Sequence, residues 1–319
     1  LRAALSLDPF LRPRPRGGSG MLRHLGYVGQ NLSLGITTGR GATLRNATPD
    51  RLRALTLENL TALAEILAFN ARERIYLFRI SSRIVPLASH PVNRLEWWRE
   101  FSTELAELGR FVRVNGMRVS MHPGQFTLLN SPDPRIREAS LRDLEWHARF
   151  LDSLGTGPDH KIVVHVGGTY RDKSGAADRF VECYRRLPER ISRRLVLEND
   201  ERSYSAEDVL AISERTGIPV VFDWLHHAAN PGAACPLRDI VERCFATWHE
   251  RDGLPKVHFS SQAPGRRPGA HSDYVDWAEF VAFYARVKDL DFDCMLEAKA
   301  KDLALLRLRA QLGRMPLAA

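Results

Sequence analysis

Short apolar runs recur along this chain, and six of them end in a side chain that commonly binds metal ions. The runs span residues 119–122, 162–165, 195–198, 220–223, 256–258 and 294–297. Their last residues are His122, His165, Glu198, Asp223, His258 and Glu297. Runs rich in Val, Ile and Leu, separated by helix-length amphipathic stretches, are typical of parallel strands buried on both faces. The sequence therefore predicts strands and helices in regular alternation.

The alternation comprises about eight units, which favours an α/β fold, a single (β/α)8 TIM barrel. Further strands are expected at 22–28 and 75–80. Apolar spacing predicts helices at 50–69, 95–114, 135–154, 177–191, 206–216, 237–249, 274–287 and 301–312. An open doubly wound sheet is the alternative, but it would gather ligands only near its switch point. In a barrel, all the strand-end side chains converge, so we expect a metal site at the C-terminal ends of the strands.

The domain organisation is expected to be simple. Residues 1–20 are rich in Pro, Gly and Arg and predict a flexible tail, and residues 21–319 form the barrel domain. Met21 is a candidate translation start. The four cysteines contain no C-x-x-C pair and are expected to be reduced. Neither a membrane-spanning run nor a secretory signal is visible, which favours a cytoplasmic protein.

The charge balance bears on the substrate. Lys and Arg number 46 against 38 Asp and Glu, a net charge of +8. Because the expected pocket concentrates carboxylates, the excess positive charge must lie elsewhere. A basic exterior around an acidic cleft suits a polyanion such as nucleic acid, although a generally Arg-rich proteome would give the same balance.

Further candidate ligands follow the strand ends. His226 comes three residues after Asp223, and His271 follows a loop rich in Gly, Pro and Arg. His90, in the loop after the second strand, is a candidate for a ligand, a phosphate contact or a loop anchor. Mixed His and carboxylate donors suit Zn²⁺, Mn²⁺ or Fe²⁺ better than a pure Mg²⁺ or Ca²⁺ site. Several carboxylates can bridge, so two to three divalent ions and displacement at phosphorus are expected.

Lys256 lies two residues before His258 and therefore on the same side of its strand. It is a candidate to pair with the metal-binding carboxylates or to be modified into a ligand. An ordinary ion pair inside the barrel is the equally acceptable alternative.

Motifs along the chain resemble the UV damage endonuclease family, which is related in fold to the endonuclease IV class of abasic-site nucleases. The resemblance runs from about Met21 to the last helix, and its motifs are specific in combination. They lie at 25–27, 31–32, 37–38, 79–82, 86–91, 120–126, 165–168, 197–200, 223–227, 256–260 and 297–299.

This resemblance implies a nuclease that uses two or three ions, usually manganese, with Zn²⁺ and Mg²⁺ as alternatives. It would cut double-stranded DNA immediately 5′ to cyclobutane dimers and 6-4 photoproducts, leave 3′-hydroxyl and 5′-phosphate ends, and start an alternative excision repair pathway. The residues implied as ligands are His122, His165, Glu198, Asp223, His226, His258, His271 and Glu297, and His90 is added as a candidate ligand from its place in the second loop. Glu198 would bridge two ions, and Glu198, Lys256 and His258 would be catalytic.

The resemblance also implies residues that contact the lesion. Gln125 and Phe126 would probe the duplex, and Tyr27 and Asn31 would line the lesion pocket. Two departures stand out. The abasic-site nucleases carry an Asp two residues before the His in the seventh loop, where this chain has Gly269, and a Tyr is also found in the family at the position of Phe126.

Two other functions compete with this interpretation. A sugar isomerase of the xylose isomerase type would share the barrel but would bind metals mainly through carboxylates. A non-enzymatic DNA-binding protein would have no use for so many convergent ligands. For the nuclease, no obligate protein partner is indicated, and a monomer is expected.

Overall fold

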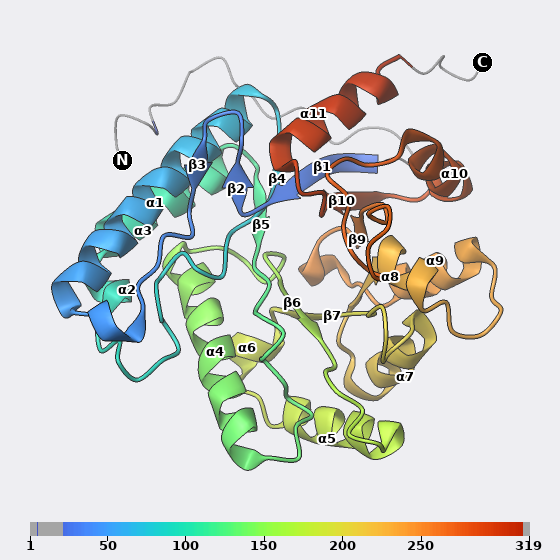
Figure 1. Cartoon of the computed structure of the whole chain (residues 1–319), viewed down its shortest axis with the longest axis horizontal. Coiled ribbons are helices and arrows are strands. Elements are labelled where there is room, and N and C mark those ends of the chain that lie inside the picture. Colours follow the sequence, from blue (N-terminus) through green and yellow to red (C-terminus); the bar gives the residue numbers. More distant parts are fainter. Residues whose placement is uncertain (1–4, 6–21, 315–319) are drawn as a thin grey trace.

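The computed structural model describes Leu5 and residues 22–314 as eight parallel strands surrounded by helices (Figure 1). The order around the sheet is β5-β4-β1-β10-β9-β8-β7-β6. The strands are β1 (Leu22–Val28), β4 (Leu77–Arg79), β5 (Arg118–Ser120), β6 (Ile162–His165), β7 (Leu195–Glu198), β8 (Val220–Asp223), β9 (Lys256–Phe259) and β10 (Phe292–Leu296). A small antiparallel hairpin, β2 (Gln30–Asn31) with β3 (Ile36–Thr37), follows β1.

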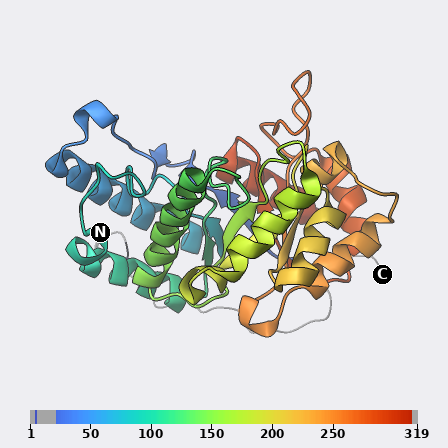
Figure 2. The ribbon, with the colours of Figure 1, turned by 90° about the horizontal axis from the view of Figure 1, so that it is seen from below.

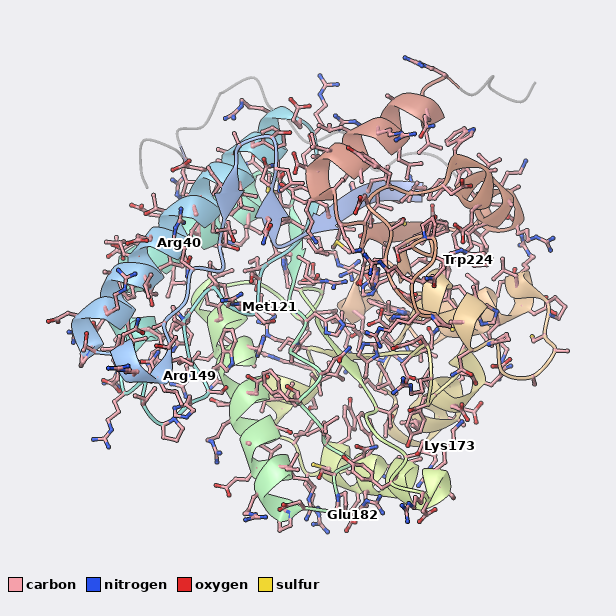
Figure 3. All side chains as sticks on the ribbon, viewed as in Figure 1. Arg40, Met121, Arg149, Lys173, Glu182 and Trp224 are labelled. Carbon is pink, nitrogen blue, oxygen red and sulfur yellow. The ribbon has the colours of Figure 1, made fainter. Side chains whose placement is uncertain are left out.

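The ring of strands closes between β5 and β6 through one isolated parallel bridge. Met121, just after β5, pairs with Ile162; its backbone N–H donates to the Lys161 carbonyl and its carbonyl accepts from Val163, each at 2.9 Å. The buried Met121 side chain is labelled near the centre of Figure 3. This closure confirms the predicted barrel and excludes the open sheet.

Helices cover the outside of the ring, as Figure 1 shows. They are α1 (Pro49–Arg72), α2 (Trp97–Glu100), α3 (Ser102–Val114), α4 (Pro134–Ser153), α5 (Lys173–Arg185), α6 (Glu189–Ser192), α7 (Ala206–Thr216), α8 (Trp224–Ala229), α9 (Leu237–Ala246), α10 (Trp277–Val287) and α11 (Lys301–Leu312). Helix α1 begins where expected, because the Thr48 side chain accepts from the Arg51 N–H and Pro49 fits the first turn.

Two predicted helices are each divided in the structure. The expected helix at 95–114 becomes α2 and α3 with a break at Phe101, whose φ and ψ of −107° and 27° leave the helical region. The expected helix at 177–191 becomes α5 and α6, separated at Pro188. Proline has no N–H to donate and disfavours a helical conformation for the residue before it, so an uninterrupted helix cannot pass this point.

The register of the strands places the predicted ligands at the same height along the barrel axis. His165 of β6 pairs with Glu198 of β7, and Asp223 of β8 pairs with His258 of β9. Because the strands are parallel, all these side chains lie at the same end of the barrel.

Charged groups occupy the opposite end of the barrel interior. The buried Arg118 guanidinium donates to the Asp293 carboxylate at 3.0 Å and to the backbone carbonyls of Asp159, Leu254 and Asp252. The fully buried Lys161 pairs with Asp252. These contacts satisfy the buried charges of Arg118 and Lys161.

Three expectations about the chain as a whole can be compared with the structure. Within the predicted tail only Leu5 is described, and it is buried in the hydrophobic core; the rest of residues 1–20 lies outside the described residues. All four cysteines are free, as predicted. No helix within the described ranges is long and apolar enough to cross a membrane.

Candidate active site

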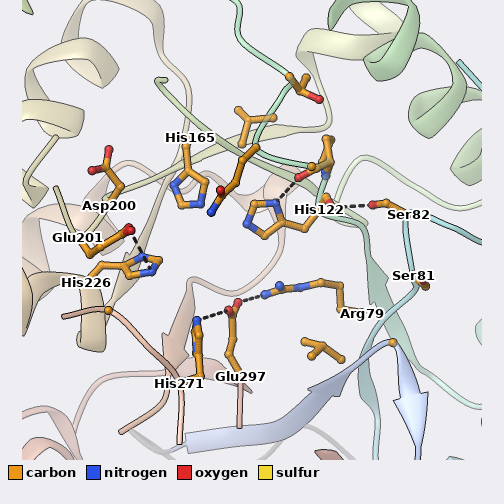
Figure 4. A pocket seen from close by; sticks show the side chains of 18 of the residues that line it. Arg79, Ser81, Ser82, His122, His165, Asp200, Glu201, His226, His271 and Glu297 are labelled. Carbon is orange, nitrogen blue, oxygen red and sulfur yellow. Dashed lines mark hydrogen bonds and ion pairs between the residues drawn. The ribbon is translucent and has the colours of Figure 1, made fainter. Parts of the chain in front are cut away.

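The C-terminal ends of the strands surround a cavity of about 820 Å³. Figure 4 shows the side chains that point into it, and several of the predicted ligands are among them. The labelled histidines and acids come from different strands or their following loops: His122, His165, Asp200, Glu201, His226, His271 and Glu297.

Two groups of possible metal ligands share one residue. His122, His165 and Glu198 form the first group, and Glu198 with Asp223, His258 and Glu297 forms the second. Within each group, one donor atom from every residue lies within 4.8 Å of the others. Glu198, which is fully buried, belongs to both groups and is placed where a bridging carboxylate would be.

The two oxygens of Glu198 face different imidazoles. Its Oε2 atom lies 3.1 Å from His122 Nε2 and 3.4 Å from His165 Nε2. Its Oε1 atom contacts His258 Nδ1, which is also 3.1 Å from Glu297 Oε1. One carboxylate therefore connects histidines on three strands or their ends.

His226 and His271 extend the row of imidazoles. The His226 ring lies 5.7 Å from that of His165 and 6.1 Å from that of His271, centroid to centroid. His226 Nε2 is 3.9 Å from Glu201, and His271 Nε2 is 3.8 Å from Glu297. Both residues are thus brought to the cavity, as predicted.

Three of these histidines are oriented by contacts on their Nδ1 side. His122 Nδ1 lies 3.1 Å from the Pro123 carbonyl, His226 Nδ1 lies 3.0 Å from the Asn199 carbonyl, and His271 Nδ1 lies 2.7 Å from Ser260 Oγ. A carbonyl can only accept, so Nδ1 of His122 and His226 carries the proton. Nε2 is left facing the carboxylates, which is the usual arrangement of a histidine that binds a metal.

Burial controls the charge of several imidazoles. It lowers the pKa of His258 to about 4, with Arg79 acting in the same direction, and it lowers the pKa of His165 and of His271. Neutral imidazole is the form that binds a metal ion, so these residues are ready ligands at neutral pH. His226 differs: burial lowers its pKa, but the surrounding carboxylates, led by Asp223, outweigh burial and raise the value to about 9.

Asp223 shows why the site suits cations. Burial, together with the nearby charges of Glu198 and Glu297, raises the pKa of its carboxyl to about 8. Its Oδ1 atom accepts from the His226 N–H at 2.7 Å, whereas its Oδ2 atom has no hydrogen-bond partner among the described residues. A divalent ion would satisfy this oxygen and offset the crowded negative charge, so the donors present fit two or more such ions.

Arg79 is a site residue that the sequence analysis did not single out. It ends β4, is 8% exposed and forms an ion pair with Glu297 (Figure 4). Its guanidinium also lies 3.2 Å from His258 Nε2. The signal was present, since an arginine at a strand end of a TIM barrel faces the same mouth as the histidines.

Glu201 is a second residue that was not predicted. It follows β7, lines the cavity and faces His226. A Cβ atom at Gly269 would lie 2.5 Å from Glu201 Cγ, so the glycine leaves room for this side chain.

Lys256 is fully buried, and its Nζ atom makes no hydrogen bond within the described part of the chain. Burial, reinforced by Arg118, holds the pKa of this amine well below its ordinary value. The ordinary ion pair considered from the sequence is therefore not found in the described residues. Its catalytic role stays a prediction.

His90 is not brought together with the other candidates. It is exposed, lies outside both ligand groups and does not line the cavity. Its Nδ1 atom accepts from the Val92 N–H at 3.1 Å. The structure thus gives His90 the role of a loop anchor, one of the three alternatives considered.

Tyr27 and Asn31 do not line the cavity, in contrast to the expectation. Both are fully buried. The Tyr27 hydroxyl donates to Asn70 Oδ1 at 2.7 Å and accepts from Asn31 Nδ2 at 2.9 Å. Asn31 Oδ1 in turn accepts from the Leu34 N–H. The polar groups of both residues hold the β2–β3 hairpin to α1 instead of facing a ligand.

Gln125 and Phe126 lie in the loop after β5, beside the cavity. Both are exposed, and Gln125 lines the cavity. Phe126 is 70% exposed, the largest value among the big apolar side chains described. Just beyond them, Thr127 Oγ1 donates to the buried Asp143 carboxylate at 2.6 Å, so the loop is anchored to α4 next to its exposed aromatic ring.

Comparisons with known proteins agree with this geometry. Residues 25–316 match the family described as UV-endonuclease UvdE. The UV DNA damage endonuclease of Clostridium perfringens is 39% identical over 284 residues, covering 89% of this chain and 69% of the relative. That of Bacillus velezensis is 41% identical over 272 residues, covering 84% and 85%.

Solved structures give the same result. SacUVDE superposes with a TM-score of 0.85 at 38% identity, covering 92% of this chain and 99% of that one. Endonuclease IV of Thermus thermophilus has a TM-score of 0.55 at 16% identity, covering 92% and 100%, and so shares the fold. On the strength of the family match and these relatives, the chain belongs to the UV DNA damage endonuclease family.

Proposed function

We propose that this chain is a metal-dependent DNA repair endonuclease that cuts immediately 5′ to UV photoproducts, both cyclobutane dimers and 6-4 photoproducts. The cut would leave 3′-hydroxyl and 5′-phosphate ends and start excision of the lesion. Family membership supports the nuclease activity. The observation that carries the proposal is the position of Glu198, which belongs to two ligand groups at the mouth of the barrel.

The first ligand group, with His122 and His165, would hold one divalent ion, and the second, with Asp223, His258 and Glu297, would hold another. His226 and His271 are available for a third. Ions bound there would activate a water molecule and stabilise the leaving oxygen in an in-line displacement. Manganese is the proposed metal.

The protein's own residues would orient the DNA around this centre. Arg79, ion-paired with Glu297, presents a positive charge next to the ligands, where it would neutralise a phosphate oxygen. Phe126 projects from an anchored loop and would insert into the duplex as an apolar wedge. Damaged nucleotides unstack more readily than intact ones, which would give the wedge its selectivity.

The direct test uses purified protein, Mn²⁺ and an end-labelled duplex that carries one cyclobutane dimer. An undamaged duplex and a sample with EDTA are the controls. We expect a single metal-dependent cut directly 5′ to the dimer, made by this chain without a partner protein. Failure to cut with Mn²⁺, Zn²⁺ or Mg²⁺ would refute the proposal and favour a small-molecule metalloenzyme.

A further inference from the structure

The loop between β9 and the His271 ligand forms a hairpin that stands out from the mouth of the barrel. Figure 2 shows this orange-brown segment rising beyond the neighbouring helices. Its base is an antiparallel bridge between Gln262 and His271, and the Ala263 N–H donates to the Ala270 carbonyl at 2.7 Å. The hairpin is therefore attached directly to the candidate metal centre.

The sequence of the hairpin, Ala-Pro-Gly-Arg-Arg-Pro-Gly-Ala from 263 to 270, places two arginines at its tip. Gly265 and Gly269 have φ values of 65° and 78°, which glycine adopts without strain, so they reverse the chain on both sides of the pair. Arg266 and Arg267 are both exposed, and Arg267 lines the cavity.

One side chain stabilises the hairpin from within. Gln262 Nε2 contacts the carbonyl oxygens of Ala263 and Arg267, each at 3.0 Å, and its Oε1 atom accepts from the Gly269 N–H at 2.9 Å. These bonds order the tip before any ligand arrives. A preformed loop loses less entropy on binding than a flexible one.

The two guanidinium groups have no partner within the protein. Across the described residues, neither Arg266 nor Arg267 forms an ion pair or donates a side-chain hydrogen bond. Glu201, a carboxylate beside the hairpin, packs against Gly269 and faces His226. Other basic side chains also line the cavity: Arg79, Arg83, Arg202, Lys299 and Lys301.

We infer that this arginine hairpin, residues 262–271, binds the phosphate backbone of the DNA duplex next to the cut site. The inference rests on the proposed function and deepens it, because it names where the backbone is held. Guanidinium groups bind phosphate through parallel hydrogen bonds, and such contacts fix the position of a protein on DNA without reading its sequence. The hairpin would thus serve damaged and undamaged duplexes alike.

The test compares the salt dependence of duplex binding for the metal-loaded wild type and the Arg266→Ala/Arg267→Ala double variant. Undamaged duplex is the probe, and fluorescence anisotropy gives the affinity. If both arginines contact phosphates, the slope of log affinity against log salt becomes less steep by about 1.8 in the double variant. Metal content should stay unchanged, because neither arginine belongs to a ligand group.

A matched control removes the same charge elsewhere. Arg72 and Arg243 are exposed in the last turns of α1 and α9, at the opposite end of the barrel, so Arg72→Ala/Arg243→Ala should keep the wild-type slope. Gln262→Ala keeps both arginines but loosens the hairpin. The Gln262→Ala variant should bind the duplex several-fold more weakly, but its slope of log affinity against log salt should equal that of the wild type, since the same phosphates are still contacted.

The outcomes separate this inference from the proposed function. A wild type that cuts at the dimer, while the double variant keeps the wild-type slope, overturns the hairpin alone. A double-variant slope no different from that of the Arg72/Arg243 control also overturns it. A wild type that binds no duplex overturns both.

Discussion

Glu198 is the residue on which the proposed chemistry most depends. We expect Glu198→Gln to abolish cutting of a dimer-containing duplex, because an amide cannot replace a carboxylate that faces two ligand groups. The thermal unfolding curve should still show a folded barrel. Glu65→Gln, an exposed site on α1, is the control and should cut normally. Wild-type cutting by the Glu198 variant would contradict the bridging role.

Phe126 is expected to act on lesion preference and not on metal binding. In Phe126→Ala the ratio of cutting or binding between damaged and undamaged duplex should fall, because the wedge is lost, while metal content stays the same. The measurement is a paired titration of both duplexes together with elemental analysis. Equal loss on the two duplexes would count against a wedge.

The sequence predicts a site residue correctly where the evidence for it lies in the neighbouring residues. The strand-end histidines and acids were identified because each closes its own apolar run. The burial of Tyr27 and Asn31 could not be predicted, because Tyr27 bonds to Asn70, which is 43 residues away in the chain. The strand-end position of Arg79 is visible in the sequence, but its pairing with Glu297, 218 residues away, is seen only in the structure.

At the scale of elements, the contact between α3 and α4 shows how closely the outer layer is packed. Gly109 of α3 faces the C-terminal end of α4, and a Cβ atom there would lie 1.7 Å from the Leu154 carbonyl oxygen. Only glycine allows this approach.

Gly109→Ala should therefore lower the free energy of unfolding by about 2 kcal/mol, because the helices must move apart. The direction of the change distinguishes two effects, since the higher helix propensity of alanine alone would raise the free energy of unfolding by about 1 kcal/mol. Urea unfolding measures the change, and Arg110→Ala, at the exposed neighbouring position, should be nearly neutral. An increase in stability for Gly109→Ala would contradict the packing argument.

The order of helices and strands was predictable, because apolar residues recur with the period of a helix or a strand wherever a whole face of that element is buried. The breaks at Phe101 and Pro188 were not predicted. The second was signalled by a proline, although the apolar spacing around it is that of a continuous helix.

At the scale of the whole molecule, buried histidines outside the site link stability to pH. Burial lowers the pKa of His147 and of His160 to about 4. An unfolded histidine has a value near 6.5, so the unfolded chain binds more protons between these values. The stability conferred by each neutral imidazole is therefore complete above about pH 6.5 and is lost as the pH falls toward 4.

Between pH 7 and pH 5, each of these histidines should reduce the free energy of unfolding by roughly 2 kcal/mol. His160 Nδ1 accepts from the Val119 N–H at 3.0 Å, and Asn provides a similar acceptor without titrating. His160→Asn should thus show a pH dependence that is smaller by about 2 kcal/mol in urea unfolding at the two pH values. An unchanged dependence would exclude His160 as the source.

The closure of the barrel at Met121 and Ile162 has a mechanical consequence. Neighbouring strands elsewhere in the barrel are joined by several paired residues, but β5 and β6 are joined by a single bridge. His122 and His165 stand on the two sides of this seam and belong to the same ligand group. A metal ion bound by both histidines would therefore link β5 to β6 across this bridge.

Removal of metal with EDTA should accordingly speed amide hydrogen exchange of Val163, which donates across the seam, and leave amides between β1 and β10 unchanged. If EDTA changed the exchange rate of Val163 and of the β1–β10 amides by the same factor, the proposed link between metal binding and barrel closure would be wrong. An ion bound for the cutting reaction would also hold β5 and β6 together. An enzyme without metal would therefore open first between these strands, next to the loop of Gln125 and Phe126.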